Sequence, residues 1–116
     1  MAKTLTELGI HKIGRRFVDS VDHAAYTLNG QPKEVQPFRT NVTGGDARVY
    51  IYFDDTVIGD VANVELVDKD GDVIATAEDR VFTKTPGKGL YIAFKYNIKE
   101  MEVESSDETL DRKSVV

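Results

Sequence analysis

Residues 89–98 carry the pattern that most restricts the fold, because their side chains alternate strictly between two kinds. One set is entirely apolar and the other mostly polar: Leu90, Ile92, Phe94, Tyr96 and Ile98 against Tyr91, Ala93, Lys95, Asn97 and Lys99. A helix would spread the apolar set around its circumference, whereas a β-strand places all of it on one side. The segment therefore predicts a strand with one face in a core.

Shorter runs of the same kind fill most of the chain, and turn residues separate them. The expected strands are residues 23–28, 33–40, 48–54, 61–67, 72–76, 80–85 and 89–98. The strongest hairpin signal is Asn29-Gly30, because both residues tolerate positive φ. Short strands at this spacing are typical of all-β domains. We therefore expect a mostly β protein, an antiparallel β-sandwich or flattened barrel of about six to eight strands.

Two predictions concern how these strands pair. Residues 80–85 and 89–98 are expected to form a hairpin across the Pro-Gly-Lys turn between them. Pro32 and Pro37 have no N–H to donate to a sheet, so residues 33–40 should lie at an edge or be irregular.

The alternation also assigns side chains to faces. Val49, Ile51 and Phe53 alternate with Tyr50 and Tyr52, so this strand should be central. In the next strand Ala62, Val64 and Leu66 are expected to share one face. After Lys99 the apolar positions become Met101 and Val103, a shift in phase that predicts a bulge or a strand end near Lys99 or Glu100.

The N-terminal segment has a helical signature. Thr4-Leu5-Thr6-Glu7 is a candidate capping box, in which a threonine hydroxyl and a glutamate three residues later bond the first amides of a helix. The apolar residues that follow are spaced by three to five: Leu5, Leu8, Ile13, Phe17 and Val21. Gly9 and Gly14 each cost about 1 kcal/mol relative to alanine, so a helix broken at one glycine is equally consistent.

These patterns divide the chain into three parts. We expect a helical segment over residues 1–22, a β domain over residues 23–103, and a flexible acidic tail over residues 104–116, whose sequence is polar and without periodicity.

Composition excludes several classes of function. The 116 residues include no cysteine, so disulfides and thiolate metal sites are absent. The net charge is -5, and the main cluster of cations in the sequence is Lys12, Arg15 and Arg16, so we expect no nucleic-acid binding. No apolar run is long enough for a signal peptide or a membrane span, which predicts a protein made in the cytoplasm.

The segment Asp68-Lys69-Asp70-Gly71-Asp72 suggests calcium, because hard cations bind several carboxylates in one loop. With Asp68 as the first position, an EF-hand requires glycine sixth and glutamate twelfth, where this chain has Val73 and Asp79. A hairpin turn with solvated aspartates is therefore expected, with no metal. A composite site of Asp54, Asp55 and Asp60 at one end of a sandwich is the other cation alternative.

Catalytic signatures are weak. His11 and His23 could form a metal pair, or one could act as a base oriented by Asp19 or Asp22. A hydrolase that uses Asp54, Asp55 or the His23 region is a further alternative. The chain has no G-x-S-x-G elbow, G-x-G-x-x-G or P-loop, so we expect no catalytic residues and no cofactor.

The tyrosines are the best candidates for a binding surface. Tyr50, Tyr52, Tyr91 and Tyr96 could form an aromatic platform if they emerge on one face, and the alternation directs the first three away from the core. Tyrosine is common both in sugar sites and in protein interfaces, and a protein contact is favoured here. The candidate interface residues are Tyr50, Tyr52, Tyr91 and Phe17.

Two stretches resemble a known group of proteins: RVYIYFDDTVIGDVANVELVDKDGDVI at residues 48–74 and KGLYIAFKYNIKEMEV at residues 88–103. Both are similar to small proteins encoded in the tail or baseplate region of tailed phages and prophages of Gram-positive bacteria. The DKDGDV turn and the GLYIAFKY strand carry the likeness.

The resemblance implies a non-enzymatic structural component of a phage tail, located in the virion and oligomeric, with copies of itself and other tail proteins as partners. A carbohydrate-binding module that recognises a host-surface glycan is the alternative, and no membrane or nucleic-acid partner is expected.

Overall fold

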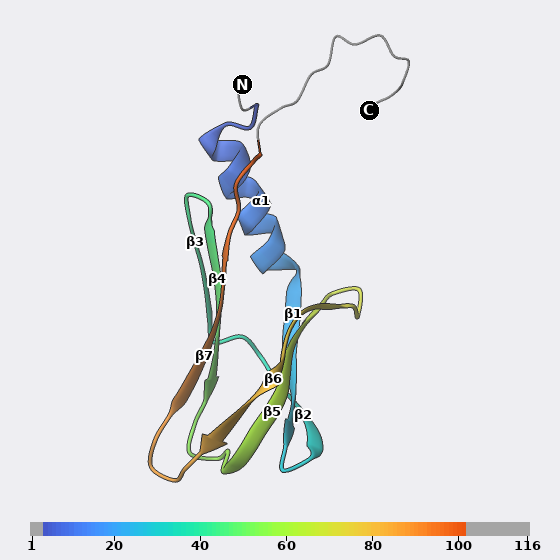
Figure 1. Cartoon of the computed structure of the whole chain (residues 1–116), viewed down its shortest axis with the longest axis vertical. Helices are drawn as coiled ribbons and strands as arrows, with labels where there is room; N and C mark the ends of the chain where they lie inside the picture. The colour runs from blue at the N-terminus through green and yellow to red at the C-terminus, as the bar shows by residue number, and fades with distance from the viewer. Residues whose placement is uncertain (1–3, 102–116) are drawn as a thin grey trace.

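The protein is an open β-sandwich of two antiparallel sheets with one helix at its N-terminal end (Figure 1). The computed structural model describes residues 4–101. In these residues the elements are α1 (Glu7–Ser20), β1 (Val21–Leu28), β2 (Gln31–Val35), β3 (Arg39–Thr43), β4 (Asp46–Phe53), β5 (Gly59–Asp68), β6 (Val73–Lys84) and β7 (Leu90–Asn97). The strand orders are β2-β1-β5-β6 and β3-β4-β7. The mostly β class with a short N-terminal helix is confirmed, as a sandwich whose sheets do not close into a barrel.

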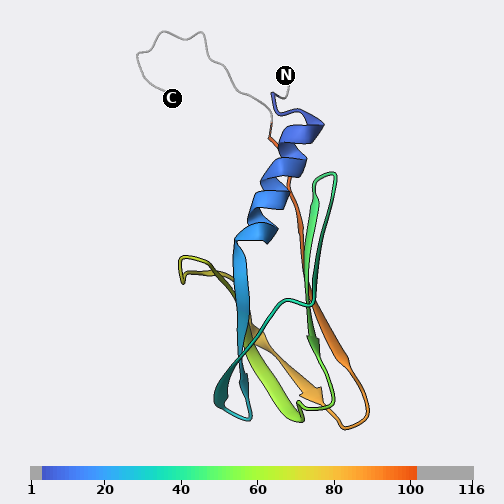
Figure 2. The same ribbon diagram turned by 180° about the vertical axis from the view of Figure 1, so that it is seen from behind.

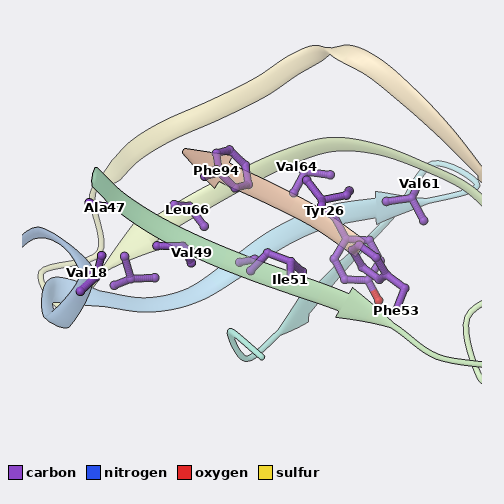
Figure 3. Packing of buried hydrophobic residues seen from close by; sticks show 13 residues of the cluster. Val18, Tyr26, Ala47, Val49, Ile51, Phe53, Val61, Val64, Leu66 and Phe94 are labelled. Carbon is purple, nitrogen blue, oxygen red and sulfur yellow. The ribbon is translucent and has the colours of Figure 1, made fainter. Parts of the chain in front are cut away.

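The core lies between the inner faces of the two sheets (Figure 3). In β4 every second residue is buried, with exposed fractions of 0% for Val49, 0% for Ile51 and 1% for Phe53. Tyr26 of β1 meets Phe53 edge to face, with ring centroids 4.9 Å apart. β4 is hydrogen-bonded on both sides, by β3 and by β7, so the predicted central strand is confirmed.

The chain passes back and forth between the sheets. β1 and β2 form the hairpin predicted at Asn29-Gly30, where φ is 51° and 86°. The single strand expected over residues 33–40 is wrong, because β2 and β3 belong to different sheets and the connection crosses between them (Figure 2). Pro37 lies in this crossing, where its missing N–H leaves no gap in a sheet. β2 is an edge strand, as its proline predicts.

The expected hairpin of residues 80–85 with residues 89–98 is also wrong. Residues 80–84 are the end of the long β6, which pairs with β5, whereas β7 pairs with β4 over its whole length. The Pro-Gly turn at residues 86–87 therefore joins the two sheets. A short turn is compatible with either connection, because turn sequence specifies the local backbone and not the partner of the strand that follows.

A bulge in β5 explains a further difference. Asn63 has a φ of 54°, and the pairing of β5 with β1 shifts there: Ala25 and Thr27 lie opposite Glu65 and Ala62, so β5 has one residue more than β1 between these pairs. The extra residue reverses the alternation, so Val61 and Val64 both point into the core with an exposed fraction of 0%. The prediction that Ala62 shares a face with Val64 and Leu66 is therefore wrong.

α1 is continuous through both glycines, so the broken-helix alternative is wrong. Its N-cap is Thr6, whose hydroxyl accepts the N–H of Gly9 at 2.9 Å, and not Thr4. Thr4 instead donates its N–H and its hydroxyl to the carboxylate of Glu100, at 2.9 and 2.7 Å. These bonds connect the start of the helix to Glu100, which follows β7. β7 ends at Asn97, just before Lys99 and Glu100, where the shift of the apolar pattern predicts a bulge or a strand end.

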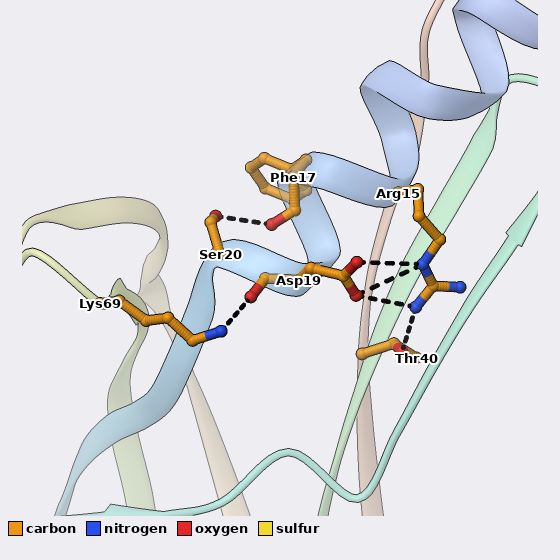
Figure 4. Close-up of polar contacts among 6 residues, drawn as sticks. All are labelled: Arg15, Phe17, Asp19, Ser20, Thr40 and Lys69. Atoms are coloured by element: carbon orange, nitrogen blue, oxygen red, sulfur yellow. Dashed lines mark hydrogen bonds and ion pairs between the residues drawn. The ribbon is translucent and has the colours of Figure 1, made fainter.

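The other end of α1 is held by the β5–β6 turn (Figure 4). The ammonium group of Lys69 donates a hydrogen bond to the carbonyl oxygen of Asp19 at 2.6 Å. The backbone N–H of Lys69 donates to the carbonyl oxygen of Ser20 at 2.9 Å. A cation at the C-terminus of a helix is favourable because the last carbonyls carry partial negative charge. Arg15 pairs with Asp19 at 3.0 Å and reaches Thr40 of β3. α1 ends at Ser20 and β1 begins at Val21, two residues before the division expected between residues 22 and 23. Residues 104–116, the expected tail, lie outside the described residues.

Gly14 lets α1 approach the β3–β4 hairpin closely. Gly14 is buried, and a Cβ atom there would lie 3.0 Å from Val42 Cγ1 and 3.3 Å from Ile98 Cδ1. The residue that weakens the helix in sequence terms is thus the one that allows its packing.

We expect Gly14→Leu to destabilise the protein by about 1–3 kcal/mol despite the better helix propensity of leucine, because the larger side chain forces α1 away from Val42 and Ile98. The measurement is urea unfolding followed by circular dichroism. Lys12→Leu, at an exposed position of the same helix, should change the free energy of unfolding by less than about 0.5 kcal/mol. Equal effects of the two variants would contradict the close-packing account.

Candidate functional site

The outward side chains of the three-stranded sheet include several aromatic rings. Tyr52 of β4 lies opposite Tyr91 of β7, and Tyr50 lies opposite Ala93 and, on its other side, Arg39 of β3. The next row places Arg48 opposite Lys95. We define the aromatic face as Phe38, Arg39, Arg48, Tyr50, Tyr52, Tyr91 and Lys95.

The rings of this face contact one another. The centroid of Tyr52 lies 4.6 Å from that of Tyr91, and Phe38 lies 5.5 and 5.7 Å from the two. A Cβ atom at Gly89 would lie 2.6 Å from the Tyr52 ring, so the glycine makes room for that ring. Phe38 and Tyr91 nevertheless remain 51% and 59% exposed, which leaves two large rings in water.

Cations accompany the rings. The guanidinium of Arg39 lies 5.8 Å from the centroid of Phe38, within the range of a cation–π contact. Arg39, Lys95 and Ala93 line a hollow of about 310 Å³ together with the rings of Phe38, Tyr50 and Tyr91. Arg48 lies 4.0 Å from the carboxylate of Asp46, an acidic residue next to this face. The aromatic face is therefore positively charged on a chain of net charge -5.

Three of the four interface residues expected from the sequence share this face, namely Tyr50, Tyr52 and Tyr91. Phe17 does not belong to it. Its ring packs edge to face on Tyr96 at 5.5 Å, on the inner side of the same sheet where α1 lies. Burial raises the pKa of the Tyr96 hydroxyl, as expected for a ring partly covered by a helix.

Sequence reasoning missed Phe38. It precedes β3 at the crossing between the sheets, where its N–H donates to the carbonyl oxygen of Tyr50 at 2.8 Å. The only sequence signal was its place directly after Pro37, which marks an irregular segment but not the face that the ring joins.

The acidic loop has the expected hairpin geometry. Carboxylate oxygens of Asp68, Asp70 and Asp72 lie within 4.8 Å of one another, the one such group of three among residues 4–101. Asp68 accepts the N–H groups of Asp70 and Asp72 at 3.0 and 2.9 Å, which closes the turn. Asp54, Asp55 and Asp60 form no such group in that part of the chain. Exposed acidic residues in a turn do not by themselves indicate a cation.

The structure brings His23 together with Asp22, one of the two carboxylates proposed to orient it. Nδ1 lies 2.8 Å from the Asp22 carboxylate, and Nε2 lies 3.5 Å from Glu34 on β2. Both ring nitrogens thus face carboxylates, and neither of the contacts brings a nucleophile to the ring. His11 lies on α1.

The carboxylate of Asp54 is hydrogen-bonded within the turn that follows β4. It accepts the N–H and the hydroxyl of Thr56, at 2.9 and 2.6 Å. The hydroxyl of Thr56, followed by its N–H, lowers the pKa of Asp54 below the ordinary value of 3.8. A general acid requires the opposite shift, so this arrangement suits a turn better than proton donation.

Comparison with protein-family models, curated proteins and solved structures found no significant match. Within residues 4–101 no helix has the length and apolar character that crossing a membrane requires.

We expect Thr56→Val to raise the pKa of Asp54 toward its ordinary value, because the variant loses the hydroxyl donor. Wild-type Asp54 stabilises the fold above pH 3.8, and this contribution disappears as the pH falls through its lowered folded value. The variant should therefore be less stable near neutral pH and equal to wild type in strong acid.

The measurements are an NMR titration of the Asp54 carboxyl carbon and urea unfolding across pH. Thr43→Val, which removes a hydroxyl bonded to Asn41, is the matched control and should leave the Asp54 titration unchanged. The same Asp54 pKa in Thr56→Val and Thr43→Val would contradict the conclusion that the Thr56 hydroxyl lowers the pKa of Asp54.

Proposed function

We propose that the protein is a non-enzymatic assembly component, of the kind found in phage tails and baseplates, that binds protein through the aromatic face. The observation that carries the proposal is the pair of exposed rings, Phe38 and Tyr91, standing beside cations on a regular sheet surface. Aromatic residues and arginine are the types enriched at the centres of protein interfaces.

The energy available on covering this face is appreciable. Aromatic side chains bury about 200 Å² each, and Phe38 and Tyr91 still expose about half of theirs. At about 25 cal/mol per Å², covering both contributes about 5 kcal/mol before the cost of association. Phe38 and Tyr91 contact each other and the ring of Tyr52, and these contacts restrict their rotamers before a partner binds.

The phage-tail part of the proposal is supported by the sequence resemblance, whose two stretches contain Tyr50, Tyr52 and Tyr91. The partners proposed are copies of the same chain and other tail proteins, in a virion. Tail structures have cyclic symmetry, and a component of this size contributes by repeating one contact.

Light scattering over a concentration series tests this function. The wild-type chain should form a discrete oligomer, and the double variant Phe38→Ala, Tyr91→Ala should be monomeric because the apolar surface is lost. Ile58→Ala is the matched control, since Ile58 has the same 51% exposure as Phe38 but lies in the β4–β5 loop.

Circular dichroism and thermal unfolding show whether the double variant is folded. A folded double variant with the mass of the wild-type oligomer would refute a role for the aromatic face, and a wild-type monomer at every concentration would refute self-assembly.

The hollow beside Tyr91 favours glycan binding as the second candidate. Three rings and two cations around about 310 Å³ suit a sugar that stacks on an aromatic face and carries an acidic group. On this alternative a cell-wall fraction retains the wild-type monomer, and Tyr50→Ala or Tyr91→Ala abolishes retention without unfolding the chain. Retention of both variants would exclude the glycan site.

A further inference from the structure

The opposite side of the sandwich has a surface of contrasting character. On the outer side of the four-stranded sheet, one row across the strands contains Glu34, Ala25, Glu65 and Thr76, and the next contains Pro32, Thr27, Ala62 and Val81. Of the four central residues in these two rows, Ala25, Thr27 and Ala62 are small and Glu65 is acidic. We define the acidic face as Glu34, Glu65 and Asp60 with the small residues Ala25, Thr27 and Ala62.

The small residues leave a shallow depression in this face. Ala25, Thr27, Pro32 and Asn63 form part of the lining of a hollow of about 570 Å³, whose charged lining residues are Glu34, Glu65 and Lys33. A hollow with a small-residue floor and acidic sides accepts aromatic side chains flanked by cations, which is the composition of the aromatic face.

Charge separates the two outer faces. The aromatic face carries Arg39, Arg48 and Lys95, with the carboxylate of Asp46 beside Arg48. The acidic face carries Glu34, Glu65 and Asp60, with Lys33 in the lining of the hollow and the imidazole of His23 3.5 Å from Glu34. Complementary charge across an interface sets its orientation and excludes partners of like sign.

The same charges disfavour a symmetric dimer through the aromatic face. In such a dimer each surface meets its own copy, so the arginines and the lysine of both subunits would be brought together. Like charges in contact at an interface cost several kcal/mol. The aromatic face therefore requires a different surface as its partner.

Taking the proposed function as its basis, we infer that this partner is the acidic face of a second copy. Phe38 and Tyr91 of one copy enter the hollow over Ala25 and Thr27 of the next, and the flanking cations meet Glu34 and Glu65. Because the two faces lie on opposite sides of one sandwich, every copy has one of each. Repetition of this head-to-tail contact closes into a ring, which is the discrete oligomer expected of the wild-type chain.

Charge-reversal variants test the inference. Glu65→Lys should lose self-association by damaging the acidic face alone, and Lys95→Glu should lose it by damaging the aromatic face alone. An equimolar mixture of Glu65→Lys with the double variant Phe38→Ala, Tyr91→Ala should form a one-to-one dimer and nothing larger, because each keeps one working face and the two damaged faces carry like charge. Asp70→Lys, the same change of charge at the tip of the β5–β6 turn, is the control and should assemble like wild type.

Cysteine cross-linking gives an independent readout, since the chain has no cysteine of its own. Ala93→Cys places a thiol on the aromatic face and Ala25→Cys places one on the acidic face, and both changes are small. On mild oxidation a mixture of the two variants should yield a disulfide-linked dimer, and each variant alone should yield none.

The outcomes separate this inference from the function on which it rests. Assembly that survives Glu65→Lys but not Phe38→Ala, Tyr91→Ala would overturn the head-to-tail contact and leave the aromatic face as a binding surface. Cross-linking of Ala93→Cys with itself would overturn it in favour of a symmetric dimer. Assembly that survives loss of both rings, or a wild-type chain that stays monomeric, would overturn the proposed function and the inference together.

Discussion

The alternation of side chains along β4 is the constraint on which the core and the candidate site both depend. Val49 and Ile51 are completely buried, and a strand of period two that points these residues inward must point Tyr50 and Tyr52 outward. Since β4 is hydrogen-bonded to β3 and to β7, the outward tyrosines stand on a surface fixed from both sides. A change that shifted the register of β4 would move its apolar residues out of the core and its tyrosines off the surface at once.

The aromatic face is completed by elements that are distant in the sequence. β7 supplies Tyr91 because the chain crosses to the three-stranded sheet after β6, and Phe38 arrives from the crossing before β3. Both crossings contain a proline, a residue that suits a segment leaving one sheet for another because it has no N–H to be satisfied there. α1 contributes from the inner side, where Phe17 packs on Tyr96.

The residues show how far the sequence alone can predict this structure. The outward direction of Tyr50, Tyr52 and Tyr91 follows from alternation within one strand, a local property, and was predicted correctly. Phe38 lies just outside a strand, so its position depends on which sheet β3 joins, and that depends on contacts between distant segments. The face predicted for Ala62 was wrong because a positive φ at Asn63 inserts a bulge that the apolar pattern does not reveal. The partner of β7 was missed for a similar reason, since a Pro-Gly turn can return a chain to the same sheet or send it to the opposite one.

The proposed assembly assigns different tasks to rings and charges. Burial of Phe38 and Tyr91 is the larger source of affinity, but it is non-directional and would favour any apolar surface, including the same face of another copy. The cations around the rings remove that alternative, while the carboxylates on the opposite sheet make one particular approach favourable. Exposed charges are screened beyond about 8 Å at physiological ionic strength, so this selection acts only when the two faces are nearly in contact. Rings without cations would associate without direction, and cations without rings would bind too weakly to hold an assembly together.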